Sequence, residues 1–447
     1  MLFSPQHVVL IAGGAVAGSE AASQLAKRGV RCIVLEQNDR PYGKIEDGLP
    51  RWHVNLRRQE EKKIDDKLAH PYVHFVPRTK LGRDLTLHDV LGWGVSAMVL
   101  AVGAWRDRPL PLSGIDAYIG RGFYYQNPFV YWFNHYPEPG YDGPQVAMAD
   151  GALVVGGGLA SLDVVKILML ETVGRALVDL DQKVDLYEME RRGISKVLEE
   201  LGLTLSQLGL RGCTLICRRP VGNMPLAEMP EGATPEQAAK TRATRRKLLE
   251  NFLNKYILQF VDETIAVGYL TEEGWLAGLR LAAVEFRDEG PVPVPGSHED
   301  HPAPLVVSSI GSILEPIPGV QMQGALYRIR DPRTGEIDGL PGIFAVGNAV
   351  TGRGNILVSQ KHGRLVSQNM LEHYLLGAAS GYEEVLSEAT AAARAKVEVV
   401  AERLAARSPL PGGKVAEILA QVKVLQDRVG YPGNYREWIE GGRPPVV

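Results

Sequence analysis

The stretch VVLIAGGAVAG at residues 8–18 and its counterpart ALVVGGGLAS at residues 152–161 decide the fold of this chain. Each places glycines directly after a short apolar run and before a helical pattern, as in a strand–turn–helix loop that holds a dinucleotide. Glycine permits the tight turn and lets the backbone approach a pyrophosphate, while the helix N-terminus offers free N–H groups. One such loop indicates only a phosphate-bearing ligand. Two in one chain predict a bound flavin and a mobile nicotinamide held near each other, and therefore electron transfer.

Residues 7–36 have the pattern of one strand–helix–strand unit around the first glycine loop. The pattern predicts a strand over residues 7–12, a helix over residues 19–28 and a second strand over residues 31–36. Glu36 ends that second strand about 20 residues beyond the glycines, where a carboxylate accepts the hydroxyls of a nucleotide ribose. This context favours a dinucleotide site over a glycine turn in an unrelated α/β protein.

The first loop departs from the usual three-glycine spacing at one position. Gly13 and Gly18 occupy the first and third positions, but Ala15 stands at the middle one. A methyl group there lies where the pyrophosphate comes closest. Gly14 supplies extra backbone freedom, so a small shift of the loop accommodates the methyl group.

The second loop keeps the spacing Gly-x-Gly-x-x-Ser, with Gly156, Gly158 and Ser161. Further on, an apolar strand pattern ends in Arg218 and Arg219. Guanidinium groups are always charged and bind phosphate through two parallel hydrogen bonds, so this pair favours the 2′-phosphate of NADPH over NADH. The alternative is that both arginines are solvated or salt-bridged surface charges.

Size and charge limit the possible functions. A chain of 447 residues is expected to form two or three domains. The net charge of −3 offers no global electrostatic basis for nucleic-acid binding. No apolar run approaches the roughly 20 residues that span a bilayer. The first predicted strand begins within a few residues of the N-terminus, so we expect neither a signal peptide nor a membrane span.

The cysteines are few, and their spacing suggests no redox or metal site. Cys32, Cys213 and Cys217 are the three present, and no Cys-x-x-Cys motif occurs. We therefore expect no thioredoxin-like disulfide, no iron–sulfur cluster and no bound metal. Buried, reduced cysteines and a cytoplasmic location are the expected state.

Several further segments follow the order found in one family of flavoproteins. They are residues 41–43, 48–50, the aromatic stretch 129–134, the helix after the second loop (156–168), the arginine pair with its proline (218–220), and residues 307–311 and 347–356. From about Val8 to about Gln368, the chain thus resembles the adrenodoxin reductase family of NADPH–ferredoxin reductases. These are FAD enzymes related to the small subunit of glutamate synthase.

The resemblance implies an α/β fold of two Rossmann-like, three-layer ββα domains, with an NAD(P) domain inserted into an FAD domain. The expected divisions are residues 1–115 and 319–376 for the FAD domain and residues 116–318 for the NAD(P) domain. Residues 377–447 would form a C-terminal helical extension, packed on the domain or contacting a partner subunit. The implied cofactors are FAD and NADP, with NAD also possible.

The same resemblance, with the two loops, predicts the site residues. The expected cofactor-binding residues are Gly13, Gly14, Ala15, Ala17, Gly18, Glu36, Gly43, Gly103, Gly156, Gly158, Leu159, Ala160, Ser161, Arg218, Arg219, Gly347, Asn348, Gly354, Asn355 and Ile356. Residues 351–356 match the stretch whose backbone runs beside the flavin ring in the family. Asn348 stands where many related flavoproteins carry an aspartate that holds the ribityl chain, and its amide can still bond a hydroxyl.

Two residues are predicted to act near the reacting rings. His53 matches a family histidine near flavin and nicotinamide, where it could tune the site or relay protons close to neutral pH. The alternative is a structural or surface histidine in a turn. Glu228 follows the arginine pair and is the expected acidic partner.

The resemblance implies hydride transfer from NADPH to the flavin, then release of single electrons to ferredoxin or another iron–sulfur protein. Basic clusters at 57–63, 191–192 and 240–247 would attract such an acidic partner, unless they are ordinary solvated helix faces. The alternatives are the nicotinamide-oxidising subunit of a larger redox complex, a flavin oxidase or monooxygenase, and a non-enzymatic flavin-binding protein. A flavoprotein disulfide reductase is disfavoured because the first helix region offers no cysteine pair.

Overall fold

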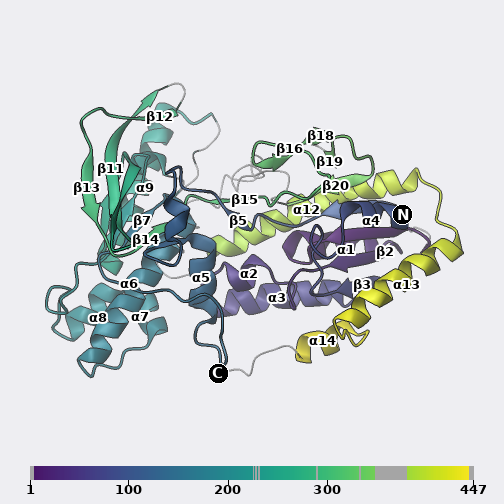
Figure 1. Cartoon of the computed structure of the whole chain (residues 1–447), viewed down its shortest axis with the longest axis horizontal. Coiled ribbons are helices and arrows are strands. Elements are labelled where there is room, and N and C mark those ends of the chain that lie inside the picture. The colour runs from purple at the N-terminus through teal and green to yellow at the C-terminus, as the bar shows by residue number, and fades with distance from the viewer. Residues whose placement is uncertain are drawn as a thin grey trace.

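A computed structural model describes residues 5–224, 226, 229, 232–287, 290–331, 334–347 and 380–441. Two lobes make up the molecule, each built on a largely parallel sheet (Figure 1). Strands from both ends of the chain form the first sheet, and the middle of the chain forms the second. The prediction of two nucleotide-binding α/β domains, one inserted into the other, is confirmed.

The first sheet has seven strands in the order β18-β19-β20-β4-β1-β2-β3. Strands β20, β4, β1, β2 and β3 run parallel, and β18 and β19 add antiparallel partners at one edge. Its strands are β1 (Val8–Ala12), β2 (Arg31–Leu35), β3 (Val73–Val76), β4 (Ala97–Leu100), β18 (Ile329–Asp331), β19 (Glu336–Ile337) and β20 (Ile343–Ala345).

Both faces of this sheet are covered, so its central strands read as continuous apolar runs. Val9 and Ile11 face one layer, whereas Val8 and Leu10 face the other. The first layer contains α1 (Val16–Ala26), α3 (Val54–Leu68) and α12 (Ser380–Ala405). The second contains α4 (Leu87–Trp93), α13 (Gly412–Arg428) and the hairpin β16 (Met322–Gln323) with β17 (Leu326–Tyr327).

The C-terminal helices are part of the first domain's core (Figure 1). On α12, Val397 and Leu404 are fully buried against the sheet, and Arg394 Nε donates to Glu20 Oε1 of α1 at 2.8 Å. On α14 (Tyr435–Gly441), the Tyr435 hydroxyl donates to Asp65 of α3 at 2.8 Å. These helices therefore stabilise the layer that carries the first glycine loop.

The second sheet has five parallel strands in the order β6-β14-β7-β8-β9. They are β6 (Phe123–Tyr125), β7 (Leu153–Val155), β8 (Thr214–Ile216), β9 (Gln259–Val261) and β14 (Val306–Ser308).

Helices cover one face of this sheet and a second sheet covers the other, which gives three layers. The helices are α5 (Gln126–His135), α6 (Leu159–Asp179), α7 (Leu186–Arg192), α8 (Ile194–Glu200) and α9 (Pro235–Tyr256), and the opposite layer is the antiparallel sheet of β10 (Thr264–Glu272), β11 (Trp275–Arg287), β12 (Gly290–Pro293) and β13 (Glu299–Pro302).

The chain passes between the domains twice, and the two crossing segments pair with each other. They are β5 (Arg106–Asp107) and β15 (Ser312–Ile313), which form a two-stranded antiparallel link. Short helix α2 (Lys44–Asp47) of the first domain lies against α5 of the second (Figure 1). The domain boundary is therefore formed by β5, β15, α2 and α5.

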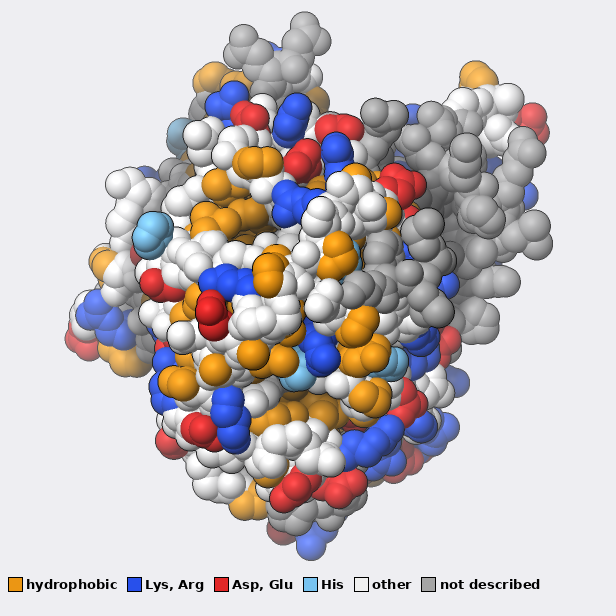
Figure 2. Space-filling model, turned by 90° about the vertical axis from the view of Figure 1, so that its right-hand side faces the viewer, with side chains coloured by type: hydrophobic (Ala, Val, Ile, Leu, Met, Phe, Trp, Pro, Cys, Tyr) orange, Lys and Arg blue, Asp and Glu red, His pale blue; other side chains and the backbone are white. Residues whose placement is uncertain are grey.

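On the face of the molecule in Figure 2, neither charge dominates among the coloured side chains. Basic and acidic side chains alternate on that face. Within the described ranges, no helix combines the length and apolar character needed to cross a membrane.

Candidate functional site

Each parallel sheet has one point where the strand order reverses, and a glycine loop leaves each of these points. In the first sheet the chain moves outward from β1 to β2 and β3 but returns on the other side as β4. In the second, it moves from β7 to β8 and β9 and returns as β14. Such reversal points open a crevice beyond the carboxyl ends of the strands, where nucleotides bind.

Close packing explains the outer two glycines of the first loop. A side-chain carbon on Gly13, whose φ is +98°, would lie 2.4 Å from the carbonyl oxygen of Ala101. A side-chain carbon on Gly18 would lie 1.8 Å from the carbonyl oxygen of Gly13. The turn is therefore closed tightly enough to present the first N–H groups of α1, a helix without a side-chain cap.

Glu36 lies at the mouth of this loop, as predicted. Its Oε2 accepts the Gly14 N–H at 2.9 Å, and its Oε1 accepts the Asn38 N–H at 3.0 Å. Burial raises the pKa of Glu36 to about 7, although backbone hydrogen bonds from Asn38, Gly14 and Gln37 act in the opposite direction. A carboxylate offers about four acceptor sites, so a ribose hydroxyl can still bind there.

The remaining described residues of the predicted FAD set gather around the same loop. A side-chain carbon on Gly43 would lie 2.9 Å from Ala15 Cβ, and one on Gly347 would lie 3.0 Å from Ala17 Cβ. Gly103 follows β4 with a φ of +65°. The structure thus brings the ends of β1, β4 and β20 together at one edge of the sheet. It provides a glycine-lined cradle that fits an extended dinucleotide such as FAD.

In the second loop, the three glycines have different surroundings. Side-chain carbons on Gly156 and Gly157 would collide with Ser309 O and Cys217 Sγ, both at 2.4 Å. By contrast, apart from its own chain neighbours, no atom of the described residues lies within 4 Å of such a carbon on Gly158. Gly158 therefore faces the open space in which a nucleotide would lie.

Ser161 and its neighbours Leu159 and Ala160 form the first turn of α6. The Ser161 hydroxyl donates to Ser309 O at 3.0 Å, so it fastens the helix to the end of β14. Gly158 precedes the helix without a side-chain cap, which leaves the first N–H groups available for a phosphate.

Arg218 and Arg219 follow β8, next to the second loop. Both side chains are exposed, and neither guanidinium group makes an ion pair or hydrogen bond within the described ranges, although the backbone of Arg219 hydrogen-bonds to the Cys217 thiol. The turn after them is held by Arg245 of α9, whose Nη1 donates to Gly222 O at 2.7 Å. Arg245 is buried, so it does not belong to the exposed basic cluster that the sequence suggested at 240–247.

His53 lies at the start of α3, buried at the domain boundary. Its Nε2 accepts the indole N–H of Trp52 at 2.9 Å. Burial lowers the pKa of His53 to about 3, and the positive charges of Lys166 and Arg57 act in the same direction. The structure thus differs from the expectation of a histidine that relays protons near neutral pH, because charging it costs desolvation beside two cations.

Sequence reasoning missed the polar contacts that hold the domains together. Lys44 Nζ of α2 donates to Ser312 Oγ at 3.0 Å and to Asn127 Oδ1 at 3.3 Å. Burial lowers the pKa of Lys44 to about 8 and raises that of nearby Asp107 to about 6. Lys44 belongs to a short charged segment after the first glycine loop, and the sequence of that segment did not indicate a contact between the domains.

On α5, Asn134 Nδ2 donates to the carbonyls of Glu46 and Leu49 at 2.9 and 3.0 Å. His135 contacts Asp47 Oδ1 through Nε2 at 3.1 Å. The segment that leads to His53 is therefore fixed to the second domain. The aromatic stretch around these residues was noted in the sequence, but not this pair of polar side chains.

Five predicted site residues lie outside the described residues. They are Glu228, Asn348, Gly354, Asn355 and Ile356. Their assignments stay predictions, as do the roles of the other site residues.

No family model matches the chain. Over 178 residues, it is 28% identical to the mitochondrial NADPH:adrenodoxin oxidoreductase of Arabidopsis thaliana, covering 39% of this chain and 36% of that protein. Over 165 residues, it is 28% identical to a glutamate synthase (NADPH) small chain of Mycobacterium tuberculosis, covering 35% of this chain and 32% of that protein. The matched stretches thus span about a third of each relative.

The fold matches over a much longer part of the chain. FprA from Mycobacterium tuberculosis superimposes with a TM-score of 0.67, covering 94% of this chain and 91% of FprA at 18% identity. The structure of FprA in complex with NADPH gives a TM-score of 0.66. This chain therefore has the two-domain fold of FprA.

Proposed function

The chain is adrenodoxin reductase-like in fold and in sequence, and from this premise we propose that it is an FAD-dependent oxidoreductase. In this proposal it takes hydride from NADPH and passes electrons one at a time to an iron–sulfur protein such as ferredoxin. The observation that carries the proposal is the pair of nucleotide cradles at the two strand-order reversals of one chain. The names of its relatives support NADPH as the donor.

The first cradle supports FAD as the resident cofactor. Gly13, Gly14 and Gly18 would let the backbone approach the pyrophosphate, and Glu36 would accept ribose hydroxyls. When bound, FAD would accept one hydride, which carries two electrons, and release these electrons singly, which protein side chains alone do not do. The chain's own contribution is to hold the flavin, align the nicotinamide and exclude water.

The second cradle supports NADPH as the mobile nucleotide. The N-terminus of α6 would hold the pyrophosphate, and the unpaired guanidinium groups of Arg218 and Arg219 would hold the 2′-phosphate. Residues at the boundary between the domains would then orient the nicotinamide. His53, a neutral imidazole at that boundary, can hydrogen-bond there without adding charge.

Similarity to glutamate synthase small chains favours a second candidate. In that case the same module would deliver electrons from the nicotinamide to a larger redox subunit instead of a free ferredoxin. Purification of the native complex distinguishes the two. A stable, stoichiometric large subunit supports this candidate, whereas an isolated flavoprotein that reduces ferredoxin supports the first.

Anaerobic titration with NADPH, and separately with NADH, tests the proposal. We expect a yellow protein whose flavin absorbance near 450 nm (an approximate value for flavins) bleaches with about one equivalent of NADPH. Subsequent addition of an oxidised ferredoxin should restore the absorbance. A colourless protein, or a flavin that neither nucleotide reduces, would overturn the proposal.

A further inference from the structure

Trp52, which is not one of the predicted site residues, lies between His53 and the second domain. The Trp52 ring packs on Phe133 of α5, with ring centroids 5.2 Å apart. Lys166 Nζ of α6 lies 4.5 Å from the centroid of the same ring. From this position, the Trp52 indole N–H donates to His53 Nε2 at 2.9 Å. Trp52 thus has two contacts to the second domain and one to His53, the predicted catalytic residue of the first.

This hydrogen bond determines which ring nitrogen of His53 carries the proton. An indole nitrogen only donates, so Nε2 of His53 must accept. The neutral ring then carries its proton on Nδ1. Protonating Nε2 would place two N–H donors against each other and break the Trp52 hydrogen bond. The contact therefore opposes both the other tautomer and the charged imidazolium.

The charged groups around His53 act in the same direction. Arg57 faces it from α3, and Lys166 faces it from α6 beyond the Trp52 ring. On α7, Glu190 is engaged with Lys166, since its Oε1 lies 2.5 Å from Lys166 Nζ. Lys255 of α9 adds a further positive charge near Glu190. Among these described neighbours, the Glu190 carboxylate therefore interacts with two lysines, Lys166 and Lys255.

The Lys166–Glu190 pair also holds Trp52 in place. Both side chains are buried, and Lys166 is 2% exposed. A buried ammonium over the face of an aromatic ring is attracted to it and limits how the ring can turn. Lys166 belongs to the helix that begins at the second glycine loop. Lys166 of the second domain therefore acts on His53 of the first domain through the Trp52 ring.

We propose that Trp52 is a positioning residue that holds His53 as the neutral Nδ1–H tautomer, and that Lys166 of the second domain keeps Trp52 in position. The inference rests on the proposed function, in which His53 lies beside the flavin and nicotinamide. In that site His53 acts as a fixed hydrogen-bond donor through Nδ1–H. It does not act as an acid or base that titrates with the medium.

The direct test is nuclear magnetic resonance of the full-length protein carrying ¹⁵N-labelled histidine. Ten histidines are present, and the His53→Gln variant assigns the His53 signals by their loss. In the native protein we expect a protonated-type Nδ1 resonance and an unprotonated-type Nε2 resonance that do not move between pH 5.5 and 8, roughly the range in which free histidine titrates. A protonated Nε2 in the native protein would overturn the proposal.

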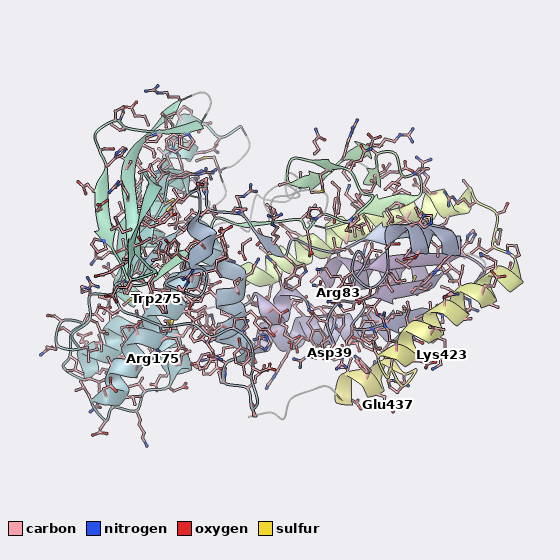
Figure 3. All side chains as sticks on the ribbon, viewed as in Figure 1. Asp39, Arg83, Arg175, Trp275, Lys423 and Glu437 are labelled. Atoms are coloured by element: carbon pink, nitrogen blue, oxygen red, sulfur yellow. The ribbon has the colours of Figure 1, made fainter. Side chains whose placement is uncertain are left out.

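Trp52→Phe keeps the ring and removes the donor. We expect the Nε2–H form to increase about fivefold or more relative to the Nδ1–H form, as the loss of one net hydrogen bond predicts. Lys166→Arg should keep the native signals, because it retains the cation over the ring. The matched control is Trp275→Phe, which makes the same change at an exposed indole on β11 (Figure 3). A Trp52→Phe spectrum identical to that of the Trp275→Phe control would also overturn the proposal.

The pH profile of anaerobic flavin reduction by NADPH is the second measurement. We expect flat profiles between about pH 5.5 and 8 in both the native protein and Trp52→Phe, because burial, Lys166 and Arg57 still oppose charging of the imidazole. The rate should be lower in Trp52→Phe at every pH, because a smaller share of His53 then carries its proton on Nδ1. Equal rates in the two proteins would argue against positioning. The NMR spectra report the His53 tautomer without any nucleotide present. A protein that fails to react with NADPH would therefore refute the proposed function, whereas the spectra alone decide the role of Trp52.

Discussion

Removing the arginine pair offers the sharpest test of how this chain selects its nucleotide. The side chains of Arg218 and Arg219 are exposed and make no ion pair or hydrogen bond within the described ranges. Arg218→Ala together with Arg219→Ala should therefore leave the free energy of unfolding almost unchanged, because no intramolecular contact is lost. Any effect on nucleotide affinity can then be attributed to binding itself.

The expected magnitude follows from the charge of the 2′-phosphate. A hydrogen bond to a charged group contributes about 1.5–3 kcal/mol, and exposure to solvent favours the lower end of that range. Two such contacts give about 3 kcal/mol, which corresponds to roughly a 100-fold increase in the Kd for NADPH. NADH has no 2′-phosphate, so its Kd should change less than about threefold.

Anaerobic flavin reduction at several concentrations of each nucleotide measures both constants. Arg175→Ala is the matched control, because it removes an exposed arginine from α6 (Figure 3). It lies 16 residues after the start of that helix, or about 24 Å along its axis. Equal weakening of NADPH and NADH in the double variant would refute the 2′-phosphate assignment. So would a comparable loss of NADPH affinity in the control.

Three further predictions concern buried positions. Burial raises the pKa of Glu36 from 4.5 to about 7, so the folded state holds an extra proton between these values and native stability falls as the pH rises through them. Chemical denaturation should therefore show Glu36→Gln gaining about 3 kcal/mol relative to the native protein between pH 4 and 8, and a constant difference would contradict this. Gly18→Ala should lower the free energy of unfolding by about 1–3 kcal/mol and release the flavin, because the new carbon would lie 1.8 Å from the Gly13 carbonyl oxygen. Gly92→Ala is the control and should retain the flavin, because no described neighbour lies within 4 Å of its new carbon. Flavin absorbance after gel filtration measures the retained cofactor, and equal retention in both variants would contradict the prediction. Lys166→Met leaves Glu190 charged and buried, and should destabilise the protein by about 3–5 kcal/mol in a denaturant titration; adding Glu190→Gln should recover most of that loss, and equal destabilisation of both variants would rule out the ion-pair explanation.

The two glycine loops could be predicted from the sequence because their determinants are local. A tight turn requires glycine within a few residues of an apolar strand, and the ribose-binding carboxylate ends the next strand. In the structure, Glu36 and Gly14, 22 residues apart, are hydrogen-bonded. Ala15 precedes α1 and lies beside Gly43, and the accommodation of its methyl group by a bound dinucleotide stays a prediction.

Long-range contacts account for what the sequence could not predict. Trp52 and Lys166 are far apart in the chain, and nothing in either local pattern indicates that they meet. One signal was available, because Lys166 is a single lysine within the apolar run VVKILML at residues 164–170. A charged residue in the middle of such a helix is buried only when it is paired. The low pKa of His53 could not be predicted for the same reason, because burial at the domain boundary and the charge of Lys166 contribute to it.

The segment of residues 43–53 combines three tasks that would otherwise be independent. Gly43 borders the first glycine loop. The carbonyls of Glu46 and Leu49 accept hydrogen bonds from Asn134 of the second domain. His53 ends the segment and accepts a hydrogen bond from Trp52. A rotation of one domain against the other must therefore strain the first loop, or release these hydrogen bonds, before it can move the histidine. Placement of the nicotinamide domain and placement of His53 are thus physically coupled. Changes in this segment should affect hydride transfer more than they affect binding of either nucleotide alone.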